Sequence, residues 1–434
     1  MKVAVAGAGI GGLCLAQGLL KAGVEVTVYE RDAELTAGGQ GYRLHIDAGP
    51  ALWACLPPDL YDLCVATSGR PSTALTVATK NLRPLTRIES APVTESAPGT
   101  ESAPRGDPAA LSMPVNRHTF REILAARLDG AGALEFGRAC AGFEQHPGGV
   151  TVRFGDGSTA DADVLVGADG VGSAVRRRYL PHALVEDTGA VCICGRTPLT
   201  ARTRPLLPAA LRDGFTAVVG DGVGMAAGVL DFREPPPQAA ARIAPDVRLS
   251  PAEPYLMWAV TGAARQFGGR HGLRELGPAN LHAAAKRAIR RWHPDLVRLV
   301  ELATVHETSL VTVRTAVPVA AWQASRVTLL GDAIHAMSPA RGSGANTALR
   351  DAALLAGELA AAARGEKSLV QAVGTYERQM IDYGFAAVQA ARAAPPAGVS
   401  FRPPGGWLPG WRGRAAARRG TEAPRRAARP GTAR

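Results

Sequence analysis

Three glycine-containing segments of the sequence carry residues that could hold a phosphorylated cofactor. The first runs from Gly7 to Gly12 and has the spacing G-x-G-x-x-G. In that spacing Gly7 allows a tight turn, Gly9 lets the backbone approach a pyrophosphate, and Gly12 lets the next helix pack on the preceding strand. The amides of the first helical turn and the helix dipole would then face the phosphates.

The elements around this glycine turn are those of a β-α-β unit. Val3–Ala6 is a short apolar run, Leu13–Lys21 reads as a helix, and Val24–Tyr29 reads as a second strand. Glu30 follows that strand, where a carboxylate can accept hydrogen bonds from the hydroxyls of a ribose. Four glycines in six residues would break the apolar helix of a secretory signal peptide, so the segment predicts a bound dinucleotide instead.

Two further segments follow apolar strands in the same way. Asp169–Arg176 follows the strand expected at 163–167, and Gly331–Asn346 follows the strand expected at 327–330. A single Asp-Gly pair is a turn far more often than a site. Three such segments in this order are hard to obtain by chance, and each is a candidate for binding a phosphate or a sugar.

This set of motifs resembles that of the single-component FAD-dependent aromatic hydroxylases, the para-hydroxybenzoate hydroxylase type of flavoprotein monooxygenase. That family uses G-x-G-x-x-G for ADP, D-G-x-x-S-x-x-R for FAD and NAD(P)H, and G-D-x-x-H-x-x-x-P-x-x-G-x-G-x-N for the ribityl end of the flavin. The match covers residues 1–394, apart from a repeat insertion near residue 100.

The resemblance implies a cofactor contact for each matching position. The pyrophosphate would be bound by Gly7, Gly9 and Gly12 and faced by Asp169, and the adenosine by Glu30 through its ribose, with Arg31 nearby. At the flavin the implied residues are Arg43 (near the ring or the pyrophosphate), Arg117 at the start of a covering helix, Asp332 on the ribityl hydroxyls, Pro339 beside the reactive face, and the amides of Gly342, Gly344, Ala345 and Asn346 at the N1–O2 edge.

The implied activity is NAD(P)H- and O2-dependent hydroxylation or epoxidation of a small aromatic or polyketide-like molecule, through a flavin C4a-hydroperoxide. NAD(P)H would dock transiently, because the sequence holds no second G-x-G-x-x-G, and no metal is needed. Two alternatives stay open. One is an FAD-dependent dehydrogenase or reductase without oxygen insertion, and the other is an inactive flavin-fold protein that binds an acidic partner through an arginine-rich tail.

Several other residues allow more than one interpretation. Arg196, at the end of an expected strand, is either a ligand for a phenolate or acid group of the substrate or an ordinary surface arginine. His45 could lie near the flavin ring or pack against the next helix. His335 is expected to be structural within the flavin loop, His293 to cap a helix, and Cys192 and Cys194 to be buried thiols.

A chain of 434 residues exceeds one ordinary core and predicts an α/β (α+β overall) protein of two domains. The Rossmann-like FAD-binding domain is expected at 1–72, 109–182 and 323–394, ending in two long helices. The sheet-rich substrate domain is expected at 73–88 and 183–322. Its strand candidates are 191–195, 215–219, 224–230, 255–261 and 309–317, with one amphipathic helix at 281–292.

The net charge of +11 is concentrated at one end of the sequence. From Arg392 onward there are ten arginines and one acid, Glu422. Residues 395–434 therefore predict a basic, disordered tail rather than a nucleic-acid-binding body. Residues 89–108 hold Glu-Ser-Ala-Pro three times and predict a flexible insertion.

The sequence also bears on the setting of the protein. It has no apolar run of about 18 residues that would indicate a membrane span. Its six cysteines are scattered, which favours reduced thiols and a cytoplasmic location over a disulfide framework or a metal site. It does not distinguish a monomer from a homodimer, nor NADH from NADPH.

Overall fold

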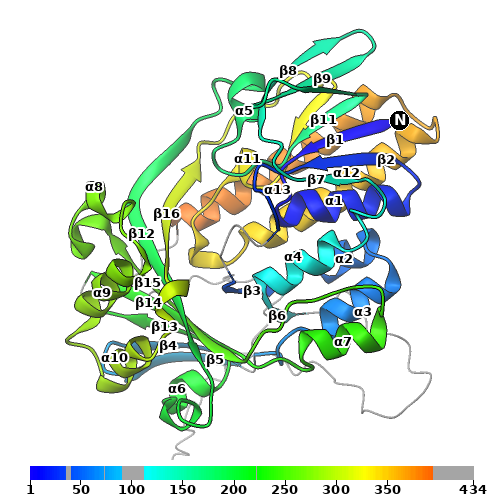
Figure 1. Ribbon diagram of the computed structural model, residues 1–434. Helices are drawn as coiled ribbons and strands as arrows, with labels where there is room; N and C mark the ends of the chain where they lie inside the picture. The colour runs from blue at the N-terminus through cyan, green and yellow to red at the C-terminus, as the bar shows by residue number, and fades with distance from the viewer. Residues whose placement is uncertain (36–40, 73, 90–111, 221, 394–434) are drawn as a thin grey trace, which may run out of the picture.

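The computed structural model describes residues 1–35, 41–72, 74–89, 112–220 and 222–393 (Figure 1). The predicted insertion at 89–108 lies outside the described residues except for its first residue, and the basic tail at 395–434 lies wholly outside them. Among the described residues, no helix combines the length and the apolarity needed to cross a bilayer.

A five-stranded parallel sheet forms the first part of the fold. Its strand order is β17-β11-β1-β2-β7, and every neighbouring pair is parallel. Parallel strands are covered by helices on both faces, which explains the short, continuously apolar sequences. The bounds are β1 (Lys2–Ala6), β2 (Glu25–Tyr29), β7 (Leu134–Glu135), β11 (Val164–Gly167) and β17 (Val327–Leu329).

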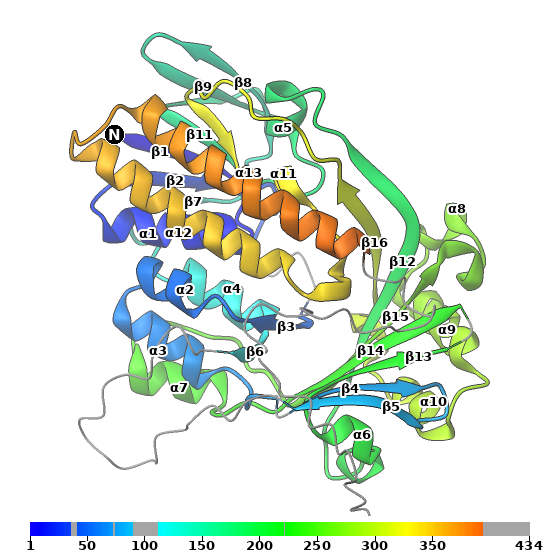
Figure 2. The same ribbon diagram turned by 180° about the vertical axis from the view of Figure 1, so that it is seen from behind.

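Helices from both ends of the chain cover this sheet. α1 (Ile10–Lys21) packs against α12 (Gly344–Ala363), and α13 (Leu369–Ala393) lies beside α12 (Figure 2). α12 buries Ala348, Ala352, Leu355 and Leu359, a three-and-four spacing that forms one helix face. The two predicted long helices are therefore confirmed. Shorter helices on this part are α2 (Gly49–Cys55), α3 (Pro58–Ala66), α4 (Arg117–Ala125), α5 (Ala174–Tyr179), α7 (Pro236–Ile243) and α11 (Asp332–His335).

Two small sheets accompany the parallel sheet. An antiparallel three-stranded sheet joins β7 to β11 and consists of β8 (Cys140–His146), β9 (Gly149–Phe154) and β10 (Thr159–Ala162). β3 (Arg43–Ile46) pairs antiparallel with β6 (Met113–Asn116), and α4 begins directly after β6. The Asn116 side chain accepts hydrogen bonds from the amides of His118 and Thr119, both at 3.0 Å, and so caps the N-terminus of α4.

A seven-stranded sheet forms the second part, with the order β16-β12-β15-β14-β13-β4-β5. The β13–β4 pair is parallel and the other pairs are antiparallel. All five predicted strands of this region are confirmed, and β12 is much longer than predicted. The bounds are β4 (Ala74–Thr79), β5 (Pro84–Glu89), β12 (Val185–Pro198), β13 (Phe215–Val219), β14 (Val223–Leu230), β15 (Tyr255–Ala263) and β16 (Ser309–Ala316).

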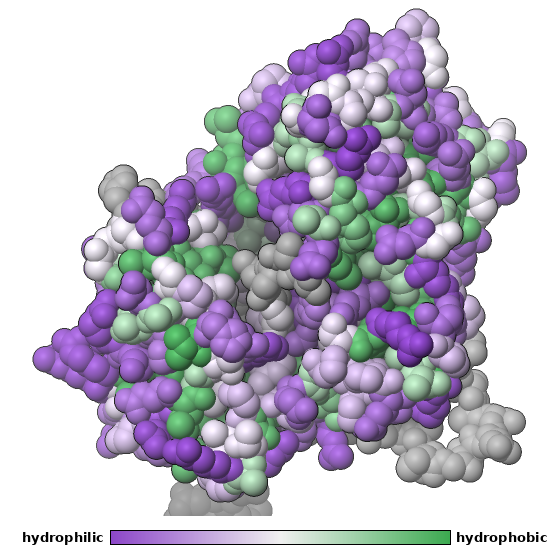
Figure 3. All heavy atoms as spheres, viewed as in Figure 1, coloured by the Kyte–Doolittle hydropathy of each residue, from purple (hydrophilic) through white to green (hydrophobic). Residues whose placement is uncertain are grey.

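The two faces of this sheet differ. One face packs a large apolar cluster around Trp258 against α9 (Pro278–Ile289) and α10 (Pro294–Glu301). Figure 3 shows mostly hydrophilic residues on the surface over these helices, at the lower left. The other face carries two small clusters, one of Cys192, Cys194 and Ala259 and one around Tyr255.

The prediction of a single helix between residues 183 and 322 is wrong. α9 starts and ends three residues before the predicted 281–292 helix, and α7 and α10 were missed. All three helices have proline within their first two residues, where its fixed φ and missing N–H cost nothing. Those prolines read as turn signals in the sequence. His293 accepts from the Asp295 amide at 3.3 Å, so its predicted capping role at α10 is confirmed.

Glu377 gives the folded protein a pH-dependent stability. This residue of α13 is 3% exposed, and its Oε1 accepts a hydrogen bond of 2.9 Å from Thr328 Oγ1. Burial raises the pKa of Glu377 from 4.5 to about 7, against a smaller lowering by Thr328 and Trp322. The folded state thus keeps a proton that the unfolded chain has released, so stability falls as the pH rises through this window.

We expect Glu377→Gln to remove this penalty. The melting temperature of the variant should exceed that of the unchanged protein by more at pH 8 than at pH 5. The gain in its free energy of unfolding at pH 8 should be at most about 3 kcal/mol. Thermal unfolding at both pH values measures this, with Glu253→Gln, at an exposed carboxylate, as the control. An equal shift at pH 5 and pH 8 would contradict the assignment.

Candidate functional site

The glycine turn after β1 has the backbone geometry that its spacing predicts. Gly7 has a φ of +109°, and a Cβ there would lie 2.5 Å from Ala168 O. A Cβ on Gly12 would lie 2.2 Å from Gly7 O, so only glycine lets α1 come this close to the loop. A Cβ on Gly9 would meet only Ala168 O, at 4.0 Å. The space outside Gly9 is therefore open to a ligand.

The N-terminus of α1 faces this open space with amide donors that have no acceptor within the helix. Its N-cap, Gly9, has no side chain, and its first turn holds no acidic residue. The first amide in the helical ladder is that of Leu13, which donates to Gly9 O at 3.0 Å. The amides of the three preceding residues have no acceptor within the helix and lie at its positive end. This donor set fits a pyrophosphate.

Glu30 holds the glycine loop in place. Its Oε2 accepts from the Ala8 amide at 2.7 Å, and its Oε1 accepts from the Asp32 amide at 3.1 Å. The sequence placed this carboxylate on ribose hydroxyls, and that role stays a prediction. Arg31 is exposed and lies 3.7 Å from Asp32 in a surface ion pair. Its predicted place near the adenosine also stays a prediction.

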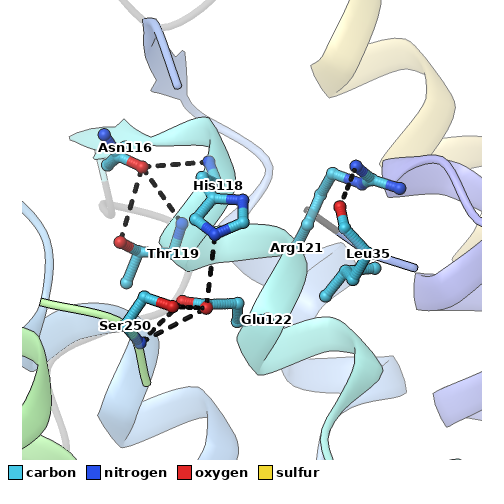
Figure 4. Close-up of polar contacts among 7 residues, drawn as sticks. All are labelled: Leu35, Asn116, His118, Thr119, Arg121, Glu122 and Ser250. Carbon is cyan, nitrogen blue, oxygen red and sulfur yellow. Dashed lines mark hydrogen bonds and ion pairs between the residues drawn. The ribbon is translucent and has the colours of Figure 1, made fainter. Parts of the chain in front are cut away.

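Arg121 is a residue of this loop that the sequence analysis missed. It is 5% exposed, and its Nε and Nη2 donate to Ala8 O at 3.3 and 3.0 Å. Its Nη1 donates to Leu35 O at 3.0 Å, as Figure 4 shows beside the Asn116 cap. Desolvation lowers the pKa of Arg121. The available signal was its position on the buried side of α4, in line with Leu124.

Arg43 and Arg117 point to different partners. The Arg117 guanidinium lies over the Tyr42 ring, 5.6 Å from its centroid. The Arg43 guanidinium contacts β14 and the segment before β4: Nε donates to Val229 O at 3.2 Å and Nη2 to Ser72 Oγ at 3.1 Å. These contacts place the Arg43 side chain on the seven-stranded sheet, whereas the resemblance placed it beside the pyrophosphate or the flavin.

The second motif (Asp169–Arg176) is hydrogen-bonded to the third (Gly331–Asn346). Asp169 Oδ2 accepts from the amides of Ala174 and Val175 at 2.7 and 3.3 Å. Its Oδ1 is buried and has no hydrogen-bond partner in the described structure, so it is available to a ligand. Arg176 Nη1 donates to Ala333 O at 2.8 Å and thereby joins this segment to α11.

A buried carboxylate fixes the third loop. Asp351 Oδ2 accepts from the Gly331 amide at 2.8 Å and lies 2.6 Å from His335 Nε2, while its Oδ1 accepts from Tyr383 Oη at 2.6 Å. Burial alone lowers the pKa of His335, but the Asp351 charge and hydrogen bond raise it overall. His335 is therefore structural, as predicted. Asp351 was missed, although an acid on the apolar stripe of α12 was the signal.

The start of α12 resembles the start of α1. Gly342 has a φ of +62°, and the N-cap Ser343 makes no side-chain cap. Thr347 N is the first amide bonded back, to Ser343 O at 2.9 Å, so the amides of Gly344, Ala345 and Asn346 have no acceptor within the helix. The Asp332 carboxylate faces this turn, since a Cβ on Gly344 would lie 3.9 Å from Asp332 Oδ1.

The Asn346 side chain itself joins α12 to β3. Its Oδ1 accepts from the Asp47 amide at 2.8 Å, and its Nδ2 donates to His45 O at 2.9 Å. The His45 ring lies in this region too, with Nε2 2.8 Å from Ser112 Oγ and 3.1 Å from Asp47 Oδ1. Pro339 is exposed and begins the short turn η5 (Pro339–Arg341) before α12. Three features of this site fit FAD. They are the open space at Gly9, the two helix starts without a side-chain cap, and the Asp169 oxygen that has no partner in the described structure.

Arg196 belongs to a second group of polar residues, on the seven-stranded sheet. It forms a two-point ion pair with Glu307, 111 residues away, which raises its pKa. Its guanidinium also lies 5.4 Å from the centre of the Tyr255 ring. The pair lines a small cavity, here called the Arg196 cavity, together with Gly41, Tyr42, Cys194, Gly195 and Ser309. The ion pair and the cavity distinguish Arg196 from an isolated surface arginine, and its role as a substrate ligand stays a prediction.

Cys192 and Cys194 point to the same side of β12 as Arg196. Their Sγ atoms are 3.4 Å apart, and Thr261 Oγ1 donates to Cys192 Sγ at 3.2 Å. Both thiols are free and buried, as predicted. The side chain of Trp258 belongs to the cluster on the opposite face of the sheet.

Comparison with known proteins places this geometry among flavoproteins. A family described as an FAD binding domain matches residues 279–391, and one described as an NAD(P)-binding Rossmann-like domain matches residues 5–64. A crystal structure from Photorhabdus luminescens, described as an FAD-containing monooxygenase, has a TM-score of 0.73 and 31% identity, covering 90% of this chain and 96% of that one.

Two curated relatives agree with this comparison. The 3-amino-4-hydroxybenzoate 2-monooxygenase of Streptomyces cremeus is 30% identical over 362 residues, which are 82% of this chain and 78% of that protein. A dual O-methyltransferase/FAD-dependent monooxygenase of Cercospora beticola is 34% identical over 404 residues, which are 87% of this chain. The chain spans only 44% of the length of that fungal protein.

The open space outside Gly9 gives a test of cofactor binding. We expect Gly9→Ala to fold, because its Cβ has room, but to bind FAD at least about tenfold more weakly, because the methyl group occupies the approach to the phosphates. Fluorescence titration of the apoprotein with FAD measures this, and circular dichroism reports folding. Gly357→Ala, at an open position of α12, is the control. Unchanged FAD affinity in Gly9→Ala would contradict the placement.

Proposed function

The chain belongs to the FAD-dependent monooxygenases, and we propose that it uses NAD(P)H and O2 to insert one oxygen atom into a small aromatic or polyketide-like molecule. The observation that carries this proposal is the meeting of three loops at the carboxyl ends of neighbouring parallel strands. β1 leads to the free amides of α1, β11 to the unpaired oxygen of Asp169, and β17 to Asp332 and the free amides of α12.

Each loop has a distinct task in this proposal. Bound FAD would supply the redox chemistry of the reaction, with the nicotinamide as reductant and O2 as co-substrate. The amides at the start of α1 would donate to its pyrophosphate. Asp332 would accept from the ribityl hydroxyls, and the amides of Gly344–Asn346 would stabilise negative charge at the edge of the ring. The buried Asp351 holds this last loop in place through its contacts with the Gly331 amide and His335.

We place the substrate between these loops and the face of the seven-stranded sheet that carries the Arg196 cavity. The Arg196–Glu307 pair has no net charge, yet it offers N–H donors and carboxylate acceptors at one place. A phenolic hydroxyl can use both, because it donates one hydrogen bond and accepts others. The hydroxybenzoate in the name of the Streptomyces cremeus relative supports an aromatic substrate.

The proposed domain boundaries follow the same division between cofactor and substrate. We propose that residues 1–72, 109–182 and 323–394 form the FAD-binding domain and that 73–88 and 183–322 form the substrate domain. The separate five-stranded and seven-stranded sheets support this division. We also propose a cytoplasmic location, which the free thiols of all six cysteines support.

Turnover with labelled oxygen tests the function. We expect the FAD-loaded protein to oxidise NADPH or NADH slowly alone, faster with its aromatic substrate, and to release a product that contains one atom from isotopically labelled O2. Stopped-flow reduction of the flavin across a panel of phenols finds the substrate, and mass spectrometry finds the label. Substrate-dependent oxidation of the nicotinamide with an unlabelled, dehydrogenated product would instead favour the dehydrogenase alternative.

The Arg196–Glu307 pair gives a test of substrate selection. We expect Arg196→Gln to raise the KM for a phenol about tenfold, because the donor is lost. Glu307→Gln leaves the Arg196 charge without its partner and should shift the preference toward aromatic carboxylates. Arg298→Gln and Glu301→Gln, at an exposed ion pair of α10, serve as matched controls. The same KM for phenols and carboxylates in all four variants would rule out this role.

A further inference from the structure

A cavity of about 730 Å3 lies away from the three loops of the flavin site. It is lined by parts of residues 70–72, 201–207, 212–214 and 229–231, and so lies where β12 and β14 end and β4 and β13 begin. We call it the Arg70 cavity. None of its lining residues belongs to the glycine loops or to the Arg196 cavity. Its volume is in the range of small-molecule sites.

The carboxylates in this cavity already have arginine partners. Asp231 accepts from Arg204 at 2.9 and 3.2 Å, and Asp213 accepts from Arg87 at 3.0 Å. Two other arginines in the lining, Arg70 and Arg212, are exposed and form no ion pair with any described carboxylate. The cavity therefore has an excess of positive charge on its wall.

A third arginine without a carboxylate partner among the described residues lies directly behind that wall. Arg43 is 5% exposed, and its only polar contacts among described residues are Val229 O and Ser72 Oγ, both from residues that line the cavity. It packs closely on β14, since a Cβ on Gly228 would lie 3.2 Å from Arg43 Cδ. Burial lowers the pKa of Arg43 to about 10, so it stays charged at neutral pH. A buried cation without a carboxylate is costly, and a bound anion would offset that cost.

The rest of the lining indicates an organic anion. Pro71, Leu207 and Val229 are apolar and belong to the same cavity as the arginines. Arginine matches the paired oxygens of carboxylates and phosphates. We propose that the Arg70 cavity binds a small organic anion, with its carboxylate or phosphate toward Arg70, Arg212 and Arg43 and its apolar part against Leu207. This site is separate from the proposed oxygenation site.

Calorimetric titration of the FAD-loaded protein tests the proposal. The probes are benzoate and phenyl phosphate, which separate a carboxylate ligand from a phosphate ligand, and saturable binding of either one supports the site. We expect the double variant Arg70→Ala/Arg212→Ala to bind the probe at least tenfold more weakly. Arg202→Ala, at an exposed neighbour outside the lining, should bind like the unchanged protein.

Two further measurements separate this site from the other cavity. Arg196→Gln should keep full probe binding, because Arg196 does not line the Arg70 cavity. In a thermal unfolding assay, the probe should raise the melting temperature of the unchanged protein but not that of Arg43→Met, whose flavin absorbance shows that it is folded. Absence of saturable binding, equal binding in the double variant, or loss of binding in Arg196→Gln would each overturn the proposal. None of these readouts depends on turnover.

Discussion

The parallel direction of β1, β11 and β17 is the constraint on which the site depends. Parallel neighbours end at the same edge of a sheet, so three loops that are far apart in the sequence meet in space. Each loop then needs only local chemistry: a glycine turn, a carboxylate, or the start of a helix. Ala168 O lies so close to Gly7 that the first two loops can meet only because Gly7 has no side chain.

Buried polar contacts hold these loops in one arrangement. Glu30 and Arg121 bind the amide and the carbonyl of Ala8, and Arg176 reaches across to Ala333 O. Asp351 satisfies three donors at once, and a buried carboxylate with its partners complete is rigid. The free amides of α1 and α12 are therefore pre-organised rather than mobile, which lowers the cost of binding a charged cofactor.

The sequence was informative where the chemistry is local and uninformative where it is not. The glycine turn, the N-cap Asn116 and the long helices depend on neighbours within a few residues, and all were predictable. The partner of Arg196 is Glu307, and the Arg43 side chain contacts Val229, both more than 100 residues away. No spacing rule predicts such pairs, because they depend on how the two sheets meet. The prediction missed helices α7 and α10 for a different reason, because proline occurs at helix starts as well as in turns.

The alternation of side chains along β12 separates two demands on one strand. Val191 and Ile193 are packed in the core against α9 and α10, and Gly195 is crowded by the Trp258 ring on that side. The intervening residues, Cys192, Cys194 and Arg196, face the opposite side, where the strand carries little of the core. Substitutions at every second residue of this strand can therefore change the lining of the Arg196 cavity, while the apolar core on the opposite face keeps its side chains.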